Sequence, residues 1–246
     1  MRLCRDVLLT KDENIIMKIV TIHQPEHLSY LGFYHKMTMA DELIVLDNVQ
    51  YEKNYFQNRN QINTKDGKKY ITVPVTNTKG NISEVLIAKE YQRQLQKNIA
   101  TIENAYKKCP YWKQYGDDFL EKYSAPFSKL EDYNISLMKW VFNKLEIDIK
   151  IVNAKDLDAV GAKGDLLLDL LHKVYADKYI AGKSGRDYLD LTNWDIPVEF
   201  QDFHHPIYTQ YGMTSFTPYM SVIDAIFNVG NEIIPIINSV NHGQKM

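Results

Sequence analysis

The sequence predicts an α/β fold with a mainly parallel, Rossmann-like open sheet and a helical insertion or subdomain. Two apolar runs, residues 19–22 and 43–46, enclose one helix-length segment, residues 30–39, which is the pattern of a βαβ unit. Residues 91–145 then carry three consecutive helical patterns, and the alternation of strand and helix returns after them. A parallel sheet whose chain is interrupted by helices is therefore expected.

Local patterns predict the remaining elements in order. Asp66-Gly67 is a hairpin turn signal before a β-branched strand at residues 70–75, which Pro74 restricts to an edge or a strand end. A last helix is expected from Thr217-Pro218 through Phe227, with Gly230 stopping it. The other expected elements are strands at residues 85–87, 147–152, 178–181 and 198–200 and helices at residues 92–106, 112–123, 130–145 and 164–174.

The predicted domain organisation follows the same patterns. Residues 17–90 and 146–238 form the α/β core, residues 91–145 are the helical insertion, and residues 239–246 are a tail. Because Met17 immediately precedes the first strand, residues 1–16 are expected to be a disordered extension or the product of a misassigned start site.

Composition limits the class of protein. The 246 residues are 45% hydrophobic and 24% charged, which are ordinary globular values, and the net charge of −2 gives no electrostatic case for nucleic-acid or membrane binding. No apolar run approaches the roughly 20 residues that span a bilayer. The two cysteines, Cys4 and Cys109, have no metal-type spacing and suit a reducing compartment. We expect a soluble, cytoplasmic protein.

Polar residues follow the first two predicted strands directly. His23 and Gln24 end the first strand, and Asp47 and Asn48 end the second. A right-handed crossover would make these strands parallel, and open parallel sheets bind ligands outside the carboxyl ends of their strands. The sequence therefore predicts a site at this edge of the sheet.

Two further segments offer groups that bind anions. In the polar segment 50–63, Arg59 lies between Asn58 and Asn60 and can contact a carboxylate or phosphate, although a solvated loop is the alternative. After the strand at 178–181, two glycines with Lys183, Ser184 and Arg186 can cradle a phosphate, or can form an ordinary turn. The spacing fits neither a Walker A loop nor a dinucleotide fingerprint.

The histidines do not predict a metal site. His204 and His205 are adjacent, and neither they nor His23 and His35 lie in a zinc-type spacing. A single histidine is either a general base or a hydrogen-bonded packing residue. No metal is predicted, and the sequence assigns no cofactor.

Four pieces in fixed order resemble one known family. They are His23-Gln24-Pro25 with Leu31-Gly32-Phe33, then Asn58-Arg59-Asn60, then the loop at 181–188, and then His205-Pro206-Ile207-Tyr208-Thr209-Gln210 leading to Ser221 and Asp224. Residues 17–238 resemble the WbqC-like family in the order and spacing of these pieces. His27 and Ser29 depart from the family pattern, which usually has an aromatic residue and a proline at these places.

The resemblance implies a setting. Members of the family are encoded among bacterial genes for O-antigen and other surface polysaccharides, including lipopolysaccharide, and a glycine-transferase role has been suggested for some. It raises the expectation of a sugar-modifying transferase with a small-molecule substrate, either a nucleotide sugar or a lipid-linked sugar.

Our first hypothesis is acyl or aminoacyl transfer to a sugar. His23 is the preferred general base, His205 is the second candidate, and Asp47 would fix the histidine tautomer or bind the acceptor amine. The expected substrate-binding residues are Gln24, Asn58, Arg59, Asn60, Lys183, Ser184, Arg186, Tyr208 and Gln210. Two alternatives stay open: a nucleotidyl-transfer or ligase-like enzyme that activates carboxylates, and a non-catalytic module that binds a glycan precursor.

Overall fold

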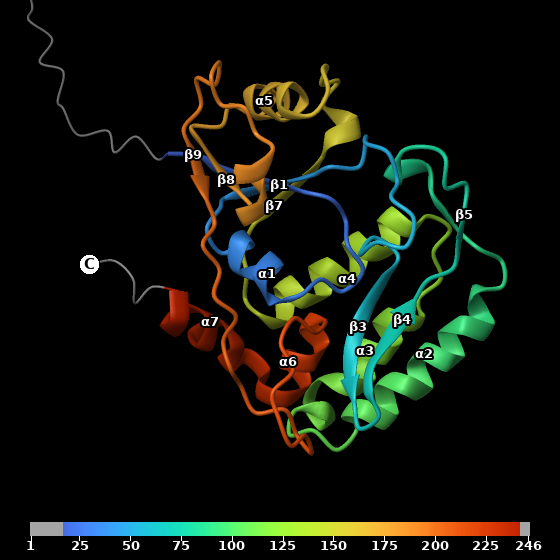
Figure 1. Cartoon of the computed structure of the whole chain (residues 1–246). Helices are drawn as coiled ribbons and strands as arrows, with labels where there is room; N and C mark the ends of the chain where they lie inside the picture. The colour runs from blue at the N-terminus through green and yellow to red at the C-terminus, as the bar shows by residue number, and fades with distance from the viewer. Residues whose placement is uncertain (1–16, 242–246) are drawn as a thin grey trace, which may run out of the picture.

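The computed structural model describes residues 17–241 (Figure 1). The predictions for residues 1–16 and for the end of the tail, residues 242–246, lie outside the described residues. The described chain arranges its elements in layers, with helix α5 on one side of a sheet and most other helices on the opposite side.

A five-stranded parallel sheet forms the first layer. Its strands lie in the order β7-β2-β1-β8-β9. Their bounds are β1 Ile19–His23, β2 Glu42–Val45, β7 Lys150–Asn153, β8 Lys178–Ala181 and β9 Val198–Phe200, and every neighbouring pair is parallel. The predicted mixed α/β class and the parallel pairing of the first two strands are confirmed.

Both faces of the sheet are covered, because alternate side chains of each strand point to opposite faces. On β2, Leu43 and Val45 belong to the core that contains helix α1 (Leu31–Met37), whereas Ile44 packs in the core that contains helix α5 (Gly164–Lys173). The four-residue run of buried side chains on β2 is thus explained by helices on either side of it.

The larger core joins α1 to the helices expected from residues 91–145. These are α2 (Tyr91–Tyr106), α3 (Trp112–Ser124) and α4 (Leu130–Lys144), and they share buried side chains with α6 (Val222–Val229) and with the β3–β4 hairpin. Strands β3 (Arg59–Thr64) and β4 (Gly67–Thr72) are antiparallel around the predicted turn, where Gly67 has a φ of +97°. A second small pair joins β5 (Val75–Thr76) to β6 (Leu86–Ile87).

Several elements differ from the sequence prediction. The strand expected at residues 70–75 is divided into β4, which ends at Thr72, and β5, which begins at Val75, and the strand expected at residues 147–152 begins at Lys150. Strand β3 begins at Arg59, inside the segment expected to be a polar loop, because its backbone finds partners in β4. Helix α6 begins at Val222 rather than at residue 217, after an extended Ser221 whose backbone N–H donates to the carbonyl of Gln61. Helix α7 (Ile233–Asn241) was not predicted. Short 3₁₀ turns occupy Ile82–Glu84, Ala154–Asp156, Lys183–Asp187 and Gly230–Glu232.

Within residues 17–241, no helix combines the length and the apolar character that a bilayer crossing requires.

Candidate functional site

A cavity of about 470 Å³ opens at the carboxyl edge of the sheet, between β1 and β8. The chain leaves β1 toward β2 on one side, whereas β8 and β9 lie on the other side, so the direction of strand order reverses here. In open α/β sheets, ligands bind at such a switch point. The lining residues are His23, Tyr30, Gly32, Phe33, Lys36, Gly182, Lys183, Ser184, Asp187, Gln201, Phe203 and Tyr219.

His23 lies between a buried lysine and a carboxylate. The Nζ atom of Lys36 is 2.9 Å from His23 Nδ1 and donates to the carbonyl of Ile22 at 3.0 Å. His23 Nε2 is 3.3 Å from Oε1 of Glu26. Helix α1 makes this arrangement possible, because it folds back over β1 and brings Lys36 beneath the histidine. Three ionisable groups from one short stretch of chain therefore form a continuous row.

Burial shifts both bases in this row toward their neutral forms. The pKa of His23 is lowered by burial and by the positive charge of Lys36, while Glu26 acts in the opposite direction. Burial lowers the pKa of Lys36 to about 7, and Glu26 again opposes the shift. Lys36 therefore changes its charge near neutral pH, which is unusual for a lysine.

The lining of the cavity combines aromatic and polar side chains. Tyr30 and Phe203 meet edge to face with ring centroids 6.0 Å apart, and Tyr30 and Tyr219 are 6.1 Å apart, so one wall is aromatic. Lys183 and Ser184, in the turn that follows β8, contribute a cation and a hydroxyl to the lining. The cavity therefore offers aromatic faces to a ring and polar groups to an anionic or carbonyl group.

The loop between β1 and α1 is held in a strained shape by two residues of the recognised motifs. Leu28 has a φ of +46°, which is unfavourable for a branched side chain. Its carbonyl accepts hydrogen bonds from Asn60 Nδ2 at 2.9 Å and from Ser221 Oγ at 2.8 Å. Asn60 was predicted to bind substrate, and the structure places it, buried, as a support for the loop that carries Tyr30.

Tyr208 and Gln210 lie in a buried network around Asp224, outside the cavity lining. Asp224 accepts hydrogen bonds from Tyr106 at 2.9 Å, from Tyr208 at 2.8 Å and from Gln210 at 2.7 Å. Burial raises the pKa of Asp224, and these hydrogen bonds oppose the shift. Asn63 of β3 donates to Gln210 at 3.1 Å, so the network joins α6 and α2 to the hairpin.

Asp47 lies in a second buried cluster. Its Oδ1 accepts from the backbone N–H of Lys155 at 2.8 Å, and Lys155 Nζ is 2.7 Å from Oε1 of Glu131. Burial, with Asp47 adding to the effect and Lys155 opposing it, raises the pKa of Glu131 to about 7. Asp47 was predicted to orient the histidine, but the groups that contact the ring nitrogens of His23 are Lys36 and Glu26.

Other predicted residues are placed beside the cavity or away from it. Gln24 accepts a hydrogen bond from Gln57 at 2.7 Å, and Asn58 donates to the carbonyl of Val73 at 2.9 Å. The guanidinium of Arg59 lies 4.5 Å above the ring of Tyr70, and that of Arg186 lies 5.4 Å from the ring of Phe200.

His205 lies behind the aromatic wall, with its ring centroid 5.0 Å from that of Tyr219. Its Nδ1 is 2.8 Å from the carbonyl of Pro206, which fixes the proton on Nδ1, and its buried Nε2 has no hydrogen-bond partner among the described residues. Burial lowers the pKa of His205, opposed by the Pro206 carbonyl. The ring packs among the aromatic rings of Phe203, Phe216 and Tyr219 beside the cavity.

Of the predicted site residues, the cavity thus brings together His23, Lys183 and Ser184. The sequence analysis missed Glu26, Tyr30, Lys36, Asp187, Gln201, Phe203 and Tyr219. A signal existed for Lys36, because it is the one lysine within an otherwise apolar or aromatic helix, LGFYHKM, that needs buried partners for its charge. Among residues 17–241, no group of three or more His, Cys, Asp or Glu side chains is placed to hold a metal ion.

Comparison with known proteins identifies the family. A model of the WbqC-like protein family matches residues 24–236. The chain belongs to the WbqC-like protein family. It is also 30% identical over 228 residues to "Uncharacterized protein Rv1507c" of Mycobacterium tuberculosis (strain ATCC 25618 / H37Rv), a match that covers 88% of this chain and 96% of that protein. No solved structure is significantly similar to the chain.

The structure gives the recurring pieces of this WbqC-like chain distinct physical roles. His23 and the turn at Lys183–Asp187 line the cavity, whereas Asn60 and Ser221 support the loop at Leu28. His27, one of the two departures from the family pattern, is buried and lies 3.1 Å from Asn134 through its Nδ1. This loop is thus anchored to α4 by a polar contact.

Proposed function

We propose that this WbqC-like protein is an enzyme of surface-polysaccharide biosynthesis that transfers an acyl or aminoacyl (glycyl) group to an amino sugar. The acceptor would be a nucleotide sugar or a lipid-linked sugar. The observation that supports a catalytic role is the row Lys36–His23–Glu26 in a cavity at the switch point of the sheet. The family resemblance supports the polysaccharide setting.

The row provides a route for the proton that the acceptor must lose. With Lys36 neutral, Nδ1–H of His23 donates to Nζ of Lys36, and the lone pair on His23 Nε2 is available to the acceptor. As the acceptor nitrogen attacks the acyl carbonyl, its proton passes to Nε2, and Glu26 stabilises the imidazolium. The surplus proton then moves from Nδ1 to Lys36, whose pKa of about 7 suits this task. When the tetrahedral intermediate collapses, its acyl–sulfur bond breaks, and the departing thiolate receives this proton back through His23.

The other cavity residues suit binding and orientation. The Ser184 hydroxyl and the Lys183 ammonium can stabilise the oxyanion that forms on the acyl carbonyl, or hold a phosphate of the donor or acceptor. Asp187 offers a carboxylate to an incoming ammonium group. His23 exposes 27% of its side chain, whereas Lys36 is 2% exposed, so the substrate reaches His23 and the proton continues to Lys36.

Several finer predictions stay proposals on the same footing. They are the Rossmann-like nature of the sheet, the division into a core and a helical insertion, the cytoplasmic location, and the substrate-binding roles of Gln24, Asn58, Arg59, Asn60, Arg186, Tyr208 and Gln210. Asp47 and His205 also stay candidates, with their present contacts favouring structural roles.

Transfer can be tested directly. Purified protein is incubated with UDP- and dTDP-linked amino sugars and coenzyme A thioesters, and mass spectrometry detects an acylated sugar. We expect product from the wild type and from the control His172→Ala, a histidine on the exposed surface of α5. His23→Ala should form no product while its thermal shift with the sugar nucleotide is retained. Wild-type turnover by His23→Ala would exclude His23 as the base.

A carboxylate-activating ligase is the second candidate, because nucleotides also bind at the switch point of parallel sheets. In this case glycine with ATP and Mg²⁺ would replace the thioester, and ATP alone would raise the unfolding temperature. A ligand at about 100 times its dissociation constant stabilises a fold by about 2.7 kcal/mol, which is readily measured. Transfer from thioesters without any effect of ATP would rule this candidate out.

A further inference from the structure

Exposed aromatic side chains extend from the mouth of the cavity to the β3–β4 hairpin. Tyr219 is 60% exposed, Tyr55 43%, Phe56 42% and Tyr70 49%. Together with Tyr30 they are termed the aromatic row. Large aromatic side chains that stay exposed in one region of a folded chain mark a contact surface more often than chance placement.

Ring contacts join four members of the row in two pairs. The rings of Tyr30 and Tyr219 are 6.1 Å apart, and those of Tyr55 and Phe56 are 4.9 Å apart. Burial raises the pKa of Tyr30 to about 12, and Glu26, Tyr219 and Tyr55 add to the shift. The backbone N–H of His27, three residues before Tyr30, donates to the carbonyl of Phe56, so the loop that carries Tyr55 and Phe56 lies beside the loop that carries Tyr30. The row therefore continues from the cavity wall onto the outer surface.

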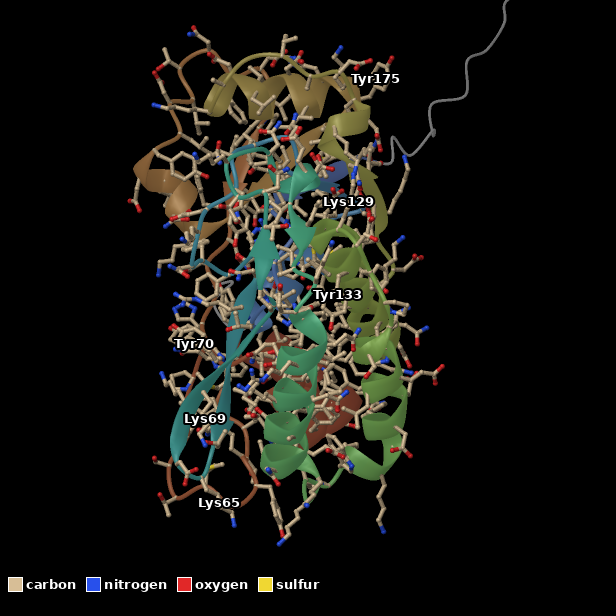
Figure 2. All side chains as sticks on the ribbon, turned by 90° about the vertical axis from the view of Figure 1, so that its right-hand side faces the viewer. Lys65, Lys69, Tyr70, Lys129, Tyr133 and Tyr175 are labelled. Carbon is tan, nitrogen blue, oxygen red and sulfur yellow. The ribbon has the colours of Figure 1, made fainter. Side chains whose placement is uncertain are left out.

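Arg59 links the row to the hairpin. Its guanidinium lies 4.5 Å above the ring of Tyr70 and donates to the carbonyl of Asn54, which precedes Tyr55. The loop is held on its other side, where the carbonyl of Phe56 accepts from the backbone N–H of His27 at 2.8 Å. Figure 2 shows Tyr70 on the hairpin, at one side of the molecule.

Two residues of this surface have a left-handed backbone. Tyr219 has a φ of +61° and Asn54 has a φ of +63°. This conformation is unfavourable for a tyrosine, and the Tyr219 ring that it presents is largely exposed rather than packed in the core. Strained residues of this kind collect at ligand-binding sites.

The charges along the row are mixed. Tyr55 has a pKa raised by burial and by the carboxylates of Glu26 and Glu52, whereas Tyr70 lies beneath the cation of Arg59. An anionic membrane or a polyanion needs a surface dominated by cations. The hairpin carries the exposed lysines Lys65, Lys68 and Lys69, but Lys69 pairs with Asp66, and the charged groups that act on Tyr55 are carboxylates. Flat apolar faces with phenol hydroxyls at their edges suit a neutral ligand that has ring faces and many hydroxyls.

We propose that the aromatic row binds a chain of neutral sugar rings that runs from the cavity to the β3–β4 hairpin. The C–H faces of pyranose rings pack on the aromatic rings, and their hydroxyls contact the phenol groups. The acceptor is then the end of an oligosaccharide, free or lipid-linked, rather than a single sugar. This inference rests on the proposed function only for the sugar inside the cavity.

The test measures binding as a function of chain length. The full chain is applied to an array of neutral O-antigen-type oligosaccharides from a single ring to about six rings, and to vesicles of phosphatidylglycerol. We expect affinity to rise with the number of rings, and the double variant Tyr55→Ala/Phe56→Ala to lose roughly tenfold for long chains and nothing for single sugars. Tyr175→Ala is the control, because Tyr175 is 86% exposed and lies at the far end of the molecule beside α5 (Figure 2).

Equal affinity for one ring and for six, no glycan binding at all, or binding to the vesicles alone would overturn the proposal. Circular dichroism and thermal unfolding confirm that the variants are folded, as expected for exposed side chains. The transfer assay is read separately. Transfer to a single sugar without dependence on chain length would refute the glycan-binding role of the aromatic row and support the transferase function. Length-dependent binding without transfer would support the role of the row and refute the transferase function.

Discussion

The buried pair Asp47–Glu131 offers a quantitative prediction, because Glu131→Gln removes one titrating group without changing its shape. Glu131 has its pKa raised from 4.5 to about 7 in the folded chain. Between these values the folded protein holds a proton that the unfolded chain releases, so the free energy of unfolding falls as pH rises through this window. At 1.36 kcal/mol per pKa unit, the fall is about 3 kcal/mol for Glu131 alone.

Chemical denaturation at a series of pH values from about 5 to 8 measures this fall. His23, Lys36 and His205 also have shifted pKa values, so the informative quantity is the difference between Glu131→Gln and the wild type at each pH. We expect the variant to gain about 2–3 kcal/mol relative to the wild type as the pH rises, because its amide can donate to Asp47 at every pH.

The control is Glu121→Gln, at an exposed position on α3. Its unfolding free energy should follow the wild type at every pH. If the curves of Glu131→Gln and the wild type are parallel, Glu131 does not hold a proton in this pH range, and the reasoning is refuted.

Three further predictions concern the site and its supports. In the NMR spectrum of ¹³C-lysine-labelled protein, one side-chain signal should titrate near pH 7 and be absent from Lys36→Met. The transfer rate should rise with pH through the same range, because only neutral Lys36 accepts the proton. Titration of the Lys36 signal near pH 10 would contradict this. In Gly32→Ala the new Cβ would overlap the Tyr30 ring, so ligand binding should weaken roughly tenfold with little change in thermal unfolding. Unchanged binding would show that the ring moves freely. Asp224→Leu leaves three buried donors without their acceptor and should lower the unfolding free energy by about 3 kcal/mol or more in urea titrations; a loss below about 1 kcal/mol would show that these donors find other partners.

Sequence patterns that extend over a few residues predicted most of the helices and strands. The apolar runs gave β1 and β2, and the helical spacing gave α2, α3 and α4 within a residue or two of their observed ends. Asp66-Gly67 predicted its turn because glycine adopts a positive φ at little cost. Helix α6 was placed too early, since the proline signal at residue 218 does not show that Tyr219 adopts a left-handed backbone and that Ser221 then bonds to the hairpin before the helix begins.

The sequence predicted only part of the candidate site, and the reason is physical. The position of His23 follows from the end of an apolar run, and position alone indicated a ligand. Its partners depend on a helix that returns over the strand, which brings Lys36 to within 2.9 Å of it. The contacts of Asn60 and Tyr208 could not be predicted either. Whether a polar side chain binds a ligand or stabilises the fold depends on the group that tertiary structure places beside it.

The sequence by itself determined the class of fold, the end of the strand at which chemistry is expected, and the family. Hydrophobic periodicity and turn residues act over a few positions, so they can be read directly from the sequence. Only the tertiary structure decided the strand order β7-β2-β1-β8-β9, and with it the meeting of His23 and Lys183 across the switch point. The two residues meet because α1 and α5 cover opposite faces of the sheet and bury them. The free energy of this burial depends on contacts between residues far apart in the chain.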